Sequence, residues 1–332
     1  MKFLICSALM SGDETLLATV DRLVDRASDE VHRIEISDPD QLEESDWFRN
    51  ARQIRKKFLK LAAASPPKST TQGIHSKIMM VKDAADLASA DKVAHTPLTI
   101  IVEDREADGV LLEILIDKLA SPELARYWNL AMTATPPAIE IDTAGGVNAM
   151  PQRVMRAISD AARQKKQARI FCICDSDDRW PNDPNNQSAT AIQNLKLVCE
   201  KNEIPIHVLM NRNAENYIPD DVYLAARDKP ENIRHLSRFN ALLRRSAQQR
   251  DHFPIKEGLN QDERAQAVAA GFYAPDEQDD LHLLEERLFP KRPRLLLQVF
   301  RDYLTTISAQ GLLARDGCNE VVGLLDRITA EL

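Results

Sequence analysis

The sequence predicts an α/β protein whose core is a parallel sheet with helices on both faces. Short, apolar, β-prone runs alternate with amphipathic segments of helical length across the middle of the chain, and several of these runs end in acidic or glycine-rich residues. Such alternation places successive strands side by side in one parallel sheet. With 332 residues, the chain is also long enough for two or three domains.

The first region is expected over residues 1–95, as a small α/β or helical unit. It contains no chemical motif, and it includes a stretch rich in Pro, Ser and Thr that is typical of a loop. The expected elements are a strand at 2–7, a helix at 13–27, a strand at 32–36, a helical segment at 40–63, a loop at 65–73 and a short helix at 78–90.

The second region, residues 96–226, carries the strands that define the fold class. Strands are expected at 98–102, 138–141, 168–174 and 204–210, with helices at 109–120, 149–164 and 188–202. Ligands of parallel sheets bind beyond the carboxyl ends of the strands. Glu103, Gly145-Gly146 and Asp175–Asp178 all follow predicted strands, so we expect them to meet at one edge of the sheet.

The third region, residues 227–332, is expected to be a helical C-terminal domain that caps the sheet or binds a partner. Leucine, valine, isoleucine and phenylalanine recur in it at helical spacing. The expected helices are 231–250, 261–270, 280–287, 294–310 and 318–331.

The acidic residues at the strand ends predict a site for a divalent cation. If Asp175 ends its strand, Asp177 can turn back toward the same point, and neighbouring carboxylates repel one another unless a proton or cation neutralises them. Mg²⁺ or Mn²⁺ suits such oxygen ligands, and Glu103 can supply a third ligand or a base. A site of this kind can polarise a phosphodiester and activate water. For the Asp-x-Asp pair alone, a solvated acidic loop is the alternative.

Three stretches resemble the TOPRIM domain of topoisomerases, bacterial primases and the overcoming-lysogenization-defect (OLD) nucleases. They are TIIVE (99–103), IEIDTAGG (139–146) and IFCICDSD (170–177). The resemblance covers roughly residues 97–220. It implies a TOPRIM, Rossmann-like parallel sheet with flanking helices, and it assigns Glu103, Asp175 and Asp177 to the catalytic metal site.

Two further stretches resemble the OLD branch of this family: NAENYIP (213–219) and FPIKEG (253–258). By this resemblance, Glu215 is either a candidate metal ligand or an acidic residue that supports the ligands without binding the metal itself. Lys256 is a candidate catalytic residue that neutralises charge on the phosphate oxygens in the transition state. The alternatives are a helix N-terminal acid for Glu215 and an ordinary exposed loop lysine for Lys256.

The segment after Glu103 departs from the family pattern. Asp104 follows it where the family often has Gly, and Ala107 stands where a further acid is expected. Glu106 and Asp108 flank that position, so Asp108 is the candidate to replace the missing ligand. One cation at the three strand-end acids is therefore a firmer prediction than two.

The resemblance implies a divalent-metal-dependent endonuclease that acts on DNA or, as the second choice, on RNA. Because the chain contains no GxxxxGK[ST] motif, an ATPase partner is expected to be a separate chain, as in two-component bacterial anti-phage systems. Two alternatives stay open. One is a catalytically degenerate TOPRIM module that scaffolds or senses a partner; the other is a metal-dependent phosphatase, whose Asp-x-Asp would follow the first core strand rather than the third.

Composition favours a cytoplasmic protein without a membrane segment, and a homo-oligomer is expected. No apolar run approaches the roughly 20 residues of a membrane span. The five cysteines form no CxxC, which is typical of reduced core residues. The net charge of −8 is not that of an obvious nucleic-acid binder, so binding would depend on local basic patches.

Overall fold

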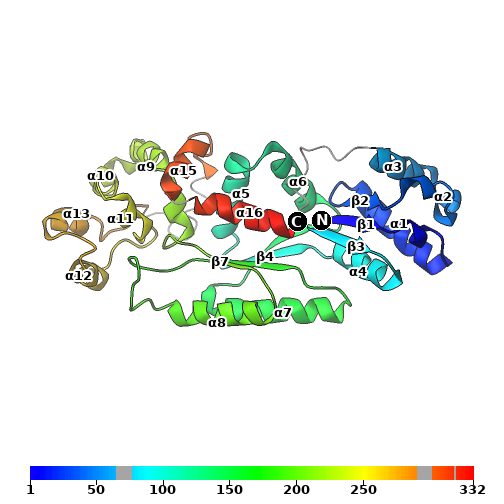
Figure 1. Ribbon diagram of the computed structural model, residues 1–332. Coiled ribbons are helices and arrows are strands. Elements are labelled where there is room, and N and C mark those ends of the chain that lie inside the picture. The colour runs from blue at the N-terminus through cyan, green and yellow to red at the C-terminus, as the bar shows by residue number, and fades with distance from the viewer. Residues whose placement is uncertain (65–76, 290–300, 318) are drawn as a thin grey trace.

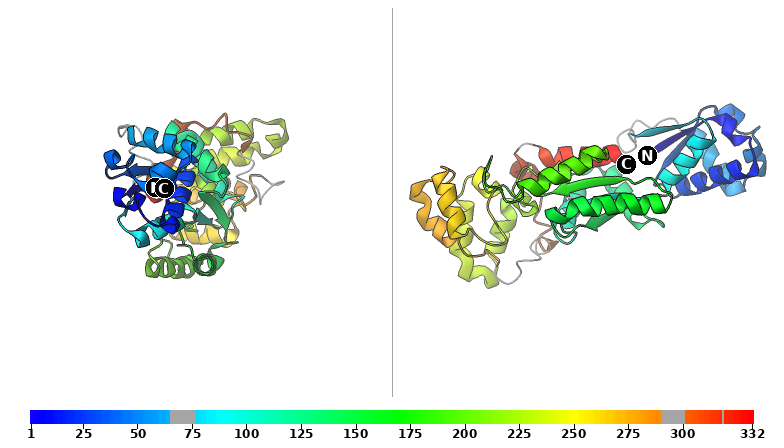
Figure 2. Two further views of the ribbon diagram at one scale, coloured as in Figure 1. Left: turned by 90° about the vertical axis from the view of Figure 1, so that its right-hand side faces the viewer. Right: turned by 90° about the horizontal axis from the view of Figure 1, so that it is seen from below.

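The computed structural model describes residues 1–64, 77–289, 301–317 and 319–332. The molecule is elongated: the N-terminal sheet lies at one end, a four-stranded sheet in the middle and a group of helices at the other end (Figures 1 and 2). The loop expected at 65–73 and the start of the helix expected at 294–310 lie outside the described residues. In the ranges given above, no helix has the length and apolarity needed to cross a bilayer.

The N-terminal region is an α/β unit, which is one of the two alternatives that the sequence left open. Its three strands are parallel in the order β2-β1-β3, and its buried apolar cluster draws only on residues 1–94. The strands are β1 (Lys2–Ile5), β2 (Arg33–Ile36) and β3 (Ile78–Val81), and the helices are α1 (Glu14–Ser28), α2 (Asp46–Asn50), α3 (Gln53–Ala64) and α4 (Ala84–Ala94).

The prediction of a short helix at 78–90 was wrong for its first residues. Residues 78–81 form β3, which pairs with β1, and the helix begins only at Ala84. The side chain of Asp83 accepts a hydrogen bond from the backbone N–H of Asp86 at 2.8 Å and so caps the first turn of α4. The β-prone residues before this cap gain more by adding an edge strand to the sheet than by extending the helix.

The middle sheet confirms the predicted fold class. Its four strands are all parallel in the order β5-β4-β6-β7, with helices on both faces: α7 and α8 on one, α5, α6 and the C-terminal α16 on the other (Figure 1). The helix α6 was not among the elements expected from the sequence. The strands are β4 (Leu98–Val102), β5 (Ile139–Thr143), β6 (Ile170–Cys174) and β7 (Ile206–Val208); the helices are α5 (Asp108–Leu119), α6 (Pro122–Thr133), α7 (Met150–Arg163) and α8 (Ala189–Lys201).

The position of β4 decides where the site forms. β4 pairs with β5 on one side and with β6 on the other, so its carboxyl end lies between the ends of both neighbours. All five residues of β6 are buried, and so are four of the five in β4. This explains why both strands appear in the sequence as continuous apolar runs, as expected of a sheet covered on both faces.

The C-terminal region is helical, although its helices are shorter than expected. The segment expected as one helix at 231–250 consists of a 3₁₀ turn and two helices, because Ser246 caps a new helix by accepting from the N–H of Gln249 at 3.2 Å. The helices are α9 (Asp220–Arg227), α10 (Leu236–Leu243), α11 (Ala247–Asp251), α12 (Gln261–Ala269), α13 (Gln278–Leu283), α15 (Ala309–Asp316) and α16 (Glu320–Glu331).

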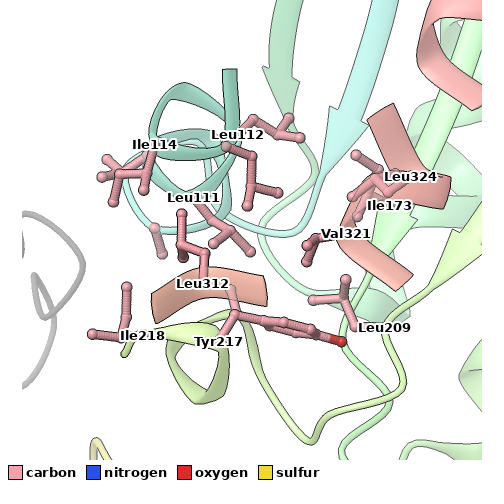
Figure 3. Packing of buried hydrophobic residues seen from close by; sticks show 14 of the residues in the cluster. Leu111, Leu112, Ile114, Ile173, Leu209, Tyr217, Ile218, Leu312, Val321 and Leu324 are labelled. Atoms are coloured by element: carbon pink, nitrogen blue, oxygen red, sulfur yellow. The ribbon is translucent and has the colours of Figure 1, made fainter. Parts of the chain in front are cut away.

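The last helix, α16, returns from the helical region to the middle sheet. Val321 and Leu324 of this helix belong to the same buried cluster as Ile173 of β6 and Leu111 of α5 (Figure 3). A helix from the end of the chain therefore completes one face of the sheet.

A buried carboxylate at the start of α16 holds the loop that follows β7. Glu320 accepts a hydrogen bond from the backbone N–H of Met210 at 2.8 Å and lies 2.8 Å from Nε2 of His207. Its second oxygen accepts from the hydroxyl of Tyr217. Because the loop between Met210 and Tyr217 carries part of the candidate site, α16 fixes the geometry of that site.

We expect Glu320→Ala to lower the free energy of unfolding by about 3 kcal/mol, since it removes three hydrogen bonds, two of which, to His207 and Tyr217, are buried. The matched control is Glu331→Ala on the same helix, which removes a more exposed ion pair with Lys77 and is expected to cost about 0–1 kcal/mol. Chemical denaturation of both variants measures the difference. Equal losses for the two substitutions would contradict this account.

Candidate metal centre

Glu103 is held by backbone groups from both neighbouring strand ends. Its carbonyl oxygen accepts from the N–H groups of Gly145 at 2.9 Å and Gly146 at 3.3 Å. Its carboxylate accepts from the N–H of Val147 at 2.8 Å through Oε2 and from that of Asp175 at 3.0 Å through Oε1. The Gly-Gly turn after β5 and the first residue after β6 therefore fix one carboxylate between them.

The two glycines are required for the conformation of this turn. Gly145 has φ of 81° and Gly146 has φ of 111°, values that favour glycine. A Cβ at either position would meet no atom within 4 Å, so crowding is not the reason for glycine here. The turn matters because it points three consecutive N–H groups at Glu103.

The two aspartates after β6 face a common partner, as the sequence predicted. Asp177 has φ of 54°, so the chain turns back directly after the strand. The side-chain amide of Asn213 donates to Oδ2 of Asp175 at 3.0 Å and to Oδ1 of Asp177 at 3.1 Å. The remaining oxygens accept from the N–H of Ala214 at 3.1 Å and from the hydroxyl of Ser188 at 2.6 Å.

The two segments that resemble the OLD branch lie together beside these aspartates. Nζ of Lys256 is 2.6 Å from Oε1 of Glu215, whose side chain is 1% exposed. Oε2 of Glu215 has no hydrogen-bond partner within the described part of the chain. The amide of Asn216 joins the segments by donating to the carbonyls of Arg250 at 2.7 Å and Phe253 at 2.9 Å. Lys256 is thus an ion-paired lysine rather than a free loop lysine.

Asp108 lies at the first turn of α5 and is buried. Its Oδ2 accepts from the backbone N–H of Asp104 at 3.0 Å, which closes the acidic segment into a turn. The negative charge of Asp108 raises the pKa of Asp175. The charges of Glu103 and Glu215 in turn raise the pKa of Asp108. The structure therefore brings all six predicted site residues into one electrostatically connected group.

Burial and mutual repulsion make this group reluctant to ionise. Burial, followed by repulsion from Asp175 and Asp177, raises the pKa of Glu103 to about 8. Burial raises the pKa of Asp108 to about 7, and repulsion from Glu103 adds to the shift. The pKa of Asp175 lies well above its usual range, first through burial and then through repulsion from Asp108.

Lys256 offsets part of this negative charge. Burial tends to lower the pKa of its ammonium, but the neighbouring carboxylates, Glu215 foremost, hold the pKa above its usual value. One ammonium facing several carboxylates still leaves an excess of negative charge. Protons or a cation must neutralise that excess at neutral pH.

The donor atoms suit a hard cation, although the acids do not form a closed cage. In residues 1–64, 77–289, 301–317 and 319–332, no three acidic, histidine or cysteine side chains converge as a metal-ligand group. The carboxylate of Glu103 meets Asp175 through a backbone N–H rather than at a shared point. Mg²⁺ is commonly held by one or two carboxylates, with water and substrate oxygens completing the shell, and this arrangement fits that mode.

A polar cleft of about 670 Å³ begins at Asp177 and runs toward α12 in the helical region. Side-chain amides and hydroxyls line it together with charged groups of both signs. The lining residues are Asp177, Arg179, Asn186, Gln187, Ser188, Arg212, Pro254, Glu257, Gly258, Asn260, Asp262, Glu263, Gln266, Glu285 and Arg287. The cleft therefore connects one acid of the candidate site, Asp177, with the helical region.

Sequence reasoning missed the roles of Asn213 and Ser188. Asn213 is the first residue of the segment that includes Glu215, and Ser188 stands at the predicted start of a helix, where serine usually caps the helix. In the structure, its hydroxyl bonds Asp177 instead of the first turn of α8. The small polar residues after β6 and β7 were the available signal, because such strand ends lie at one edge of the sheet.

We expect the stability of the cation-free protein to fall as pH rises from about 5 to 8. The folded Glu103 keeps its proton up to a pKa of about 8, whereas the unfolded residue loses it near its ordinary value of 4.5. The folded state thus binds more protons in this window, and the loss is on the order of 2 kcal/mol after a discount for partial exposure. Urea denaturation with chelator at both pH values measures it. Glu103→Gln should reduce the dependence, while Asp108 and Asp175, whose pKa values are also raised, retain part of it. Stability that rises with pH would contradict the assignment.

Comparisons with known proteins leave the site to be interpreted from its own geometry. No family model, no curated protein and no solved structure matches this chain. What is established is an α/β protein with two parallel sheets, whose buried acids gather at the carboxyl ends of β4 and β6.

Proposed function

We propose that the protein is a divalent-metal-dependent endonuclease built on a TOPRIM-like sheet, related to the OLD nucleases and hydrolysing phosphodiesters of DNA or, as second choice, RNA. One observation carries the proposal: buried acids with excess negative charge meet at the ends of two adjacent parallel strands, beside a lysine and a polar cleft. A separate ATPase partner, a homo-oligomeric state and a cytoplasmic location stay predictions from the sequence.

Each residue has a role that follows from its surroundings. A bound Mg²⁺ or Mn²⁺ would supply a Lewis acid for the phosphate oxygens and a water of lowered pKa. Asp175 and Asp177 would hold it, with Glu103 as the third acid at the strand ends. Burial and repulsion raise the pKa of Glu103 to about 8 in the cation-free protein, and a bound cation would keep its carboxylate ionised, so that it could serve as a ligand or as the base for the attacking water. Lys256 would neutralise charge that develops on the phosphate oxygens.

The lining of the cleft favours contacts with a sugar-phosphate backbone. The described lining offers the guanidinium groups of Arg179, Arg212 and Arg287 and several side-chain amides, and it includes no aromatic residue. It also carries five acidic residues, and two of the arginines are ion-paired with Asp183 and Glu263, so a bound cation would have to offset the excess of negative charge. Guanidinium and amide donors contact phosphate oxygens, whereas reading of single-stranded bases usually needs aromatic stacking. We therefore propose a substrate that is bound through its backbone, with little dependence on base sequence.

A non-catalytic scaffold or sensor is the second candidate. The absence of three converging acids in the described ranges favours it, since a cation would be held loosely. Absence of saturable Mg²⁺ or Mn²⁺ binding, together with absence of any cleavage of DNA or RNA, would support this candidate. The phosphatase alternative has less support, because its Asp-x-Asp would follow the first core strand, whereas Asp175 and Asp177 follow β6, the third strand of the middle sheet along the chain.

Asp175→Asn and Glu103→Gln should each lower the rate of cleavage by about 100-fold or more, because each removes a charge that holds the cation. The assay follows nicking of supercoiled DNA and cleavage of RNA with Mg²⁺, with Mn²⁺ and with chelator. Glu106→Gln is the matched control, an exposed acid of the same loop, and should keep wild-type activity. If the site variants cleave as fast as this control, the proposed function is wrong.

Lys256→Met tests whether the lysine acts in catalysis beyond its ion pair. It leaves Glu215 buried without its cation, so we expect a loss of about 2 kcal/mol in stability together with a strong loss of activity. The double variant Lys256→Met/Glu215→Gln should recover the stability and remain inactive. Recovery of both stability and activity would show that the lysine serves only the structure.

A further inference from the structure

A single side-chain amide lies between the two aspartates of the proposed cation site. Nδ2 of Asn213 is within hydrogen-bond distance of one oxygen from each carboxylate, at 3.0 Å from Asp175 and 3.1 Å from Asp177. Two carboxylates this close to a shared donor repel each other, and the amide hydrogens partly offset that repulsion. Asn213 therefore favours the arrangement in which both carboxylates face the same point.

The backbone around Asn213 is tied to the aspartate loop on both sides. The carbonyl of Arg212 accepts from the N–H of Asp177 at 3.0 Å, and the N–H of Ala214 donates to Asp175 at 3.1 Å. The carbonyl of Asn211 accepts from the hydroxyl of Ser176 at 3.0 Å. Since the backbone is fixed at Asn211 and Arg212 before it and at Ala214 after it, the side chain of Asn213 has little freedom to leave the carboxylates.

A second observation marks the same place as a site for a ligand. Glu215, two residues after Asn213, is 1% exposed, and its Oε2 lacks a hydrogen-bond partner within the described ranges. The preceding residue, Ala214, donates its N–H to Asp175 at 3.1 Å, so Glu215 belongs to the segment that contacts this ligand. A buried carboxylate oxygen without a donor is costly unless a further group, such as a cation or its bound water, approaches it.

We infer that Asn213 is a positioning residue that sets the affinity of this site for a divalent cation. It holds Asp175 and Asp177 through one oxygen each. The second oxygen of each carboxylate accepts one further hydrogen bond, from Ala214 or Ser188, and each carboxylate keeps lone pairs for the cation. Hydrogen bonds to ligating carboxylates raise metal affinity because they fix the ligands before binding, and loss of such a bond typically weakens affinity by about 10- to 100-fold. The inference rests on the cation site of the proposed function, although not on cleavage itself.

Two other roles for Asn213 predict different results. If the amide only filled the space that a cation takes, its removal would raise affinity, because the cation would no longer displace a hydrogen-bonded group. If the amide served only the stability of the loop, its removal would lower the melting temperature and leave affinity in the folded protein unchanged. The sign of the change in affinity therefore separates the three roles.

The experiment is a calorimetric titration of the full chain with Mn²⁺, at a temperature where every variant is folded. Asn213→Ala should weaken binding about 10-fold or more. The matched control is Asn185→Ala, an exposed asparagine of the same loop that does not line the cleft and whose hydrogen bonds to Arg179 and Asp183 use its backbone. The control should bind within about two-fold of wild type. The electron paramagnetic resonance spectrum of bound Mn²⁺ should broaden in Asn213→Ala and not in the control.

Each outcome has a distinct consequence. Equal or tighter Mn²⁺ binding by Asn213→Ala overturns the inference and leaves the proposed function standing. An equal loss in the control also overturns it, because the effect would then belong to the loop as a whole. Absence of saturable binding in the wild-type protein overturns both. If Asn213→Ala does not fold, Asn213→Ser replaces it, and affinity equal to wild type in that variant counts against the inference.

Discussion

The site depends on the carboxylate of Glu103 accepting hydrogen bonds from both neighbouring strand ends. β4 lies between β5 and β6, and this carboxylate bonds the first N–H after β6 and an N–H of the turn after β5. Such bonds are possible only where three parallel strands end at the same level. The arrangement brings a charge into a buried region, so the sheet that positions the acid also raises its pKa.

The repulsion among these carboxylates explains why the surrounding loops carry so many hydrogen-bond donors. Asp175 and Asp177 each accept two hydrogen bonds, and Glu215 is paired with Lys256. The donors compensate part of the desolvation of the acids and leave a net negative charge. Perturbed carboxyl groups gathered in this way are characteristic of functional sites, because stability alone favours apolar residues at buried positions.

The sequence was sufficient to predict the middle sheet and the three acids at its edge, because buried parallel strands are continuous apolar runs and their ends are polar. It did not predict β3, since Ile78–Val81 is too short to distinguish a strand from the start of a helix. It did not predict the amide of Asn213 between the aspartates either. Asn213 and Asp177 are 36 residues apart along the chain, so their contact depends on how the two loops that carry them are placed in the folded protein.

The return of α16 to the sheet shows why the helical region matters to a site that lies on strands. Glu320 fixes Met210 and Tyr217, the residues that flank the loop with Asn213 and Glu215. The same loop is bonded by Asn216 to the segment that carries Lys256. The acids of β4 and β6 thus come from one part of the chain, while the groups that hold and balance them depend on packing that forms only when the last helix is in place.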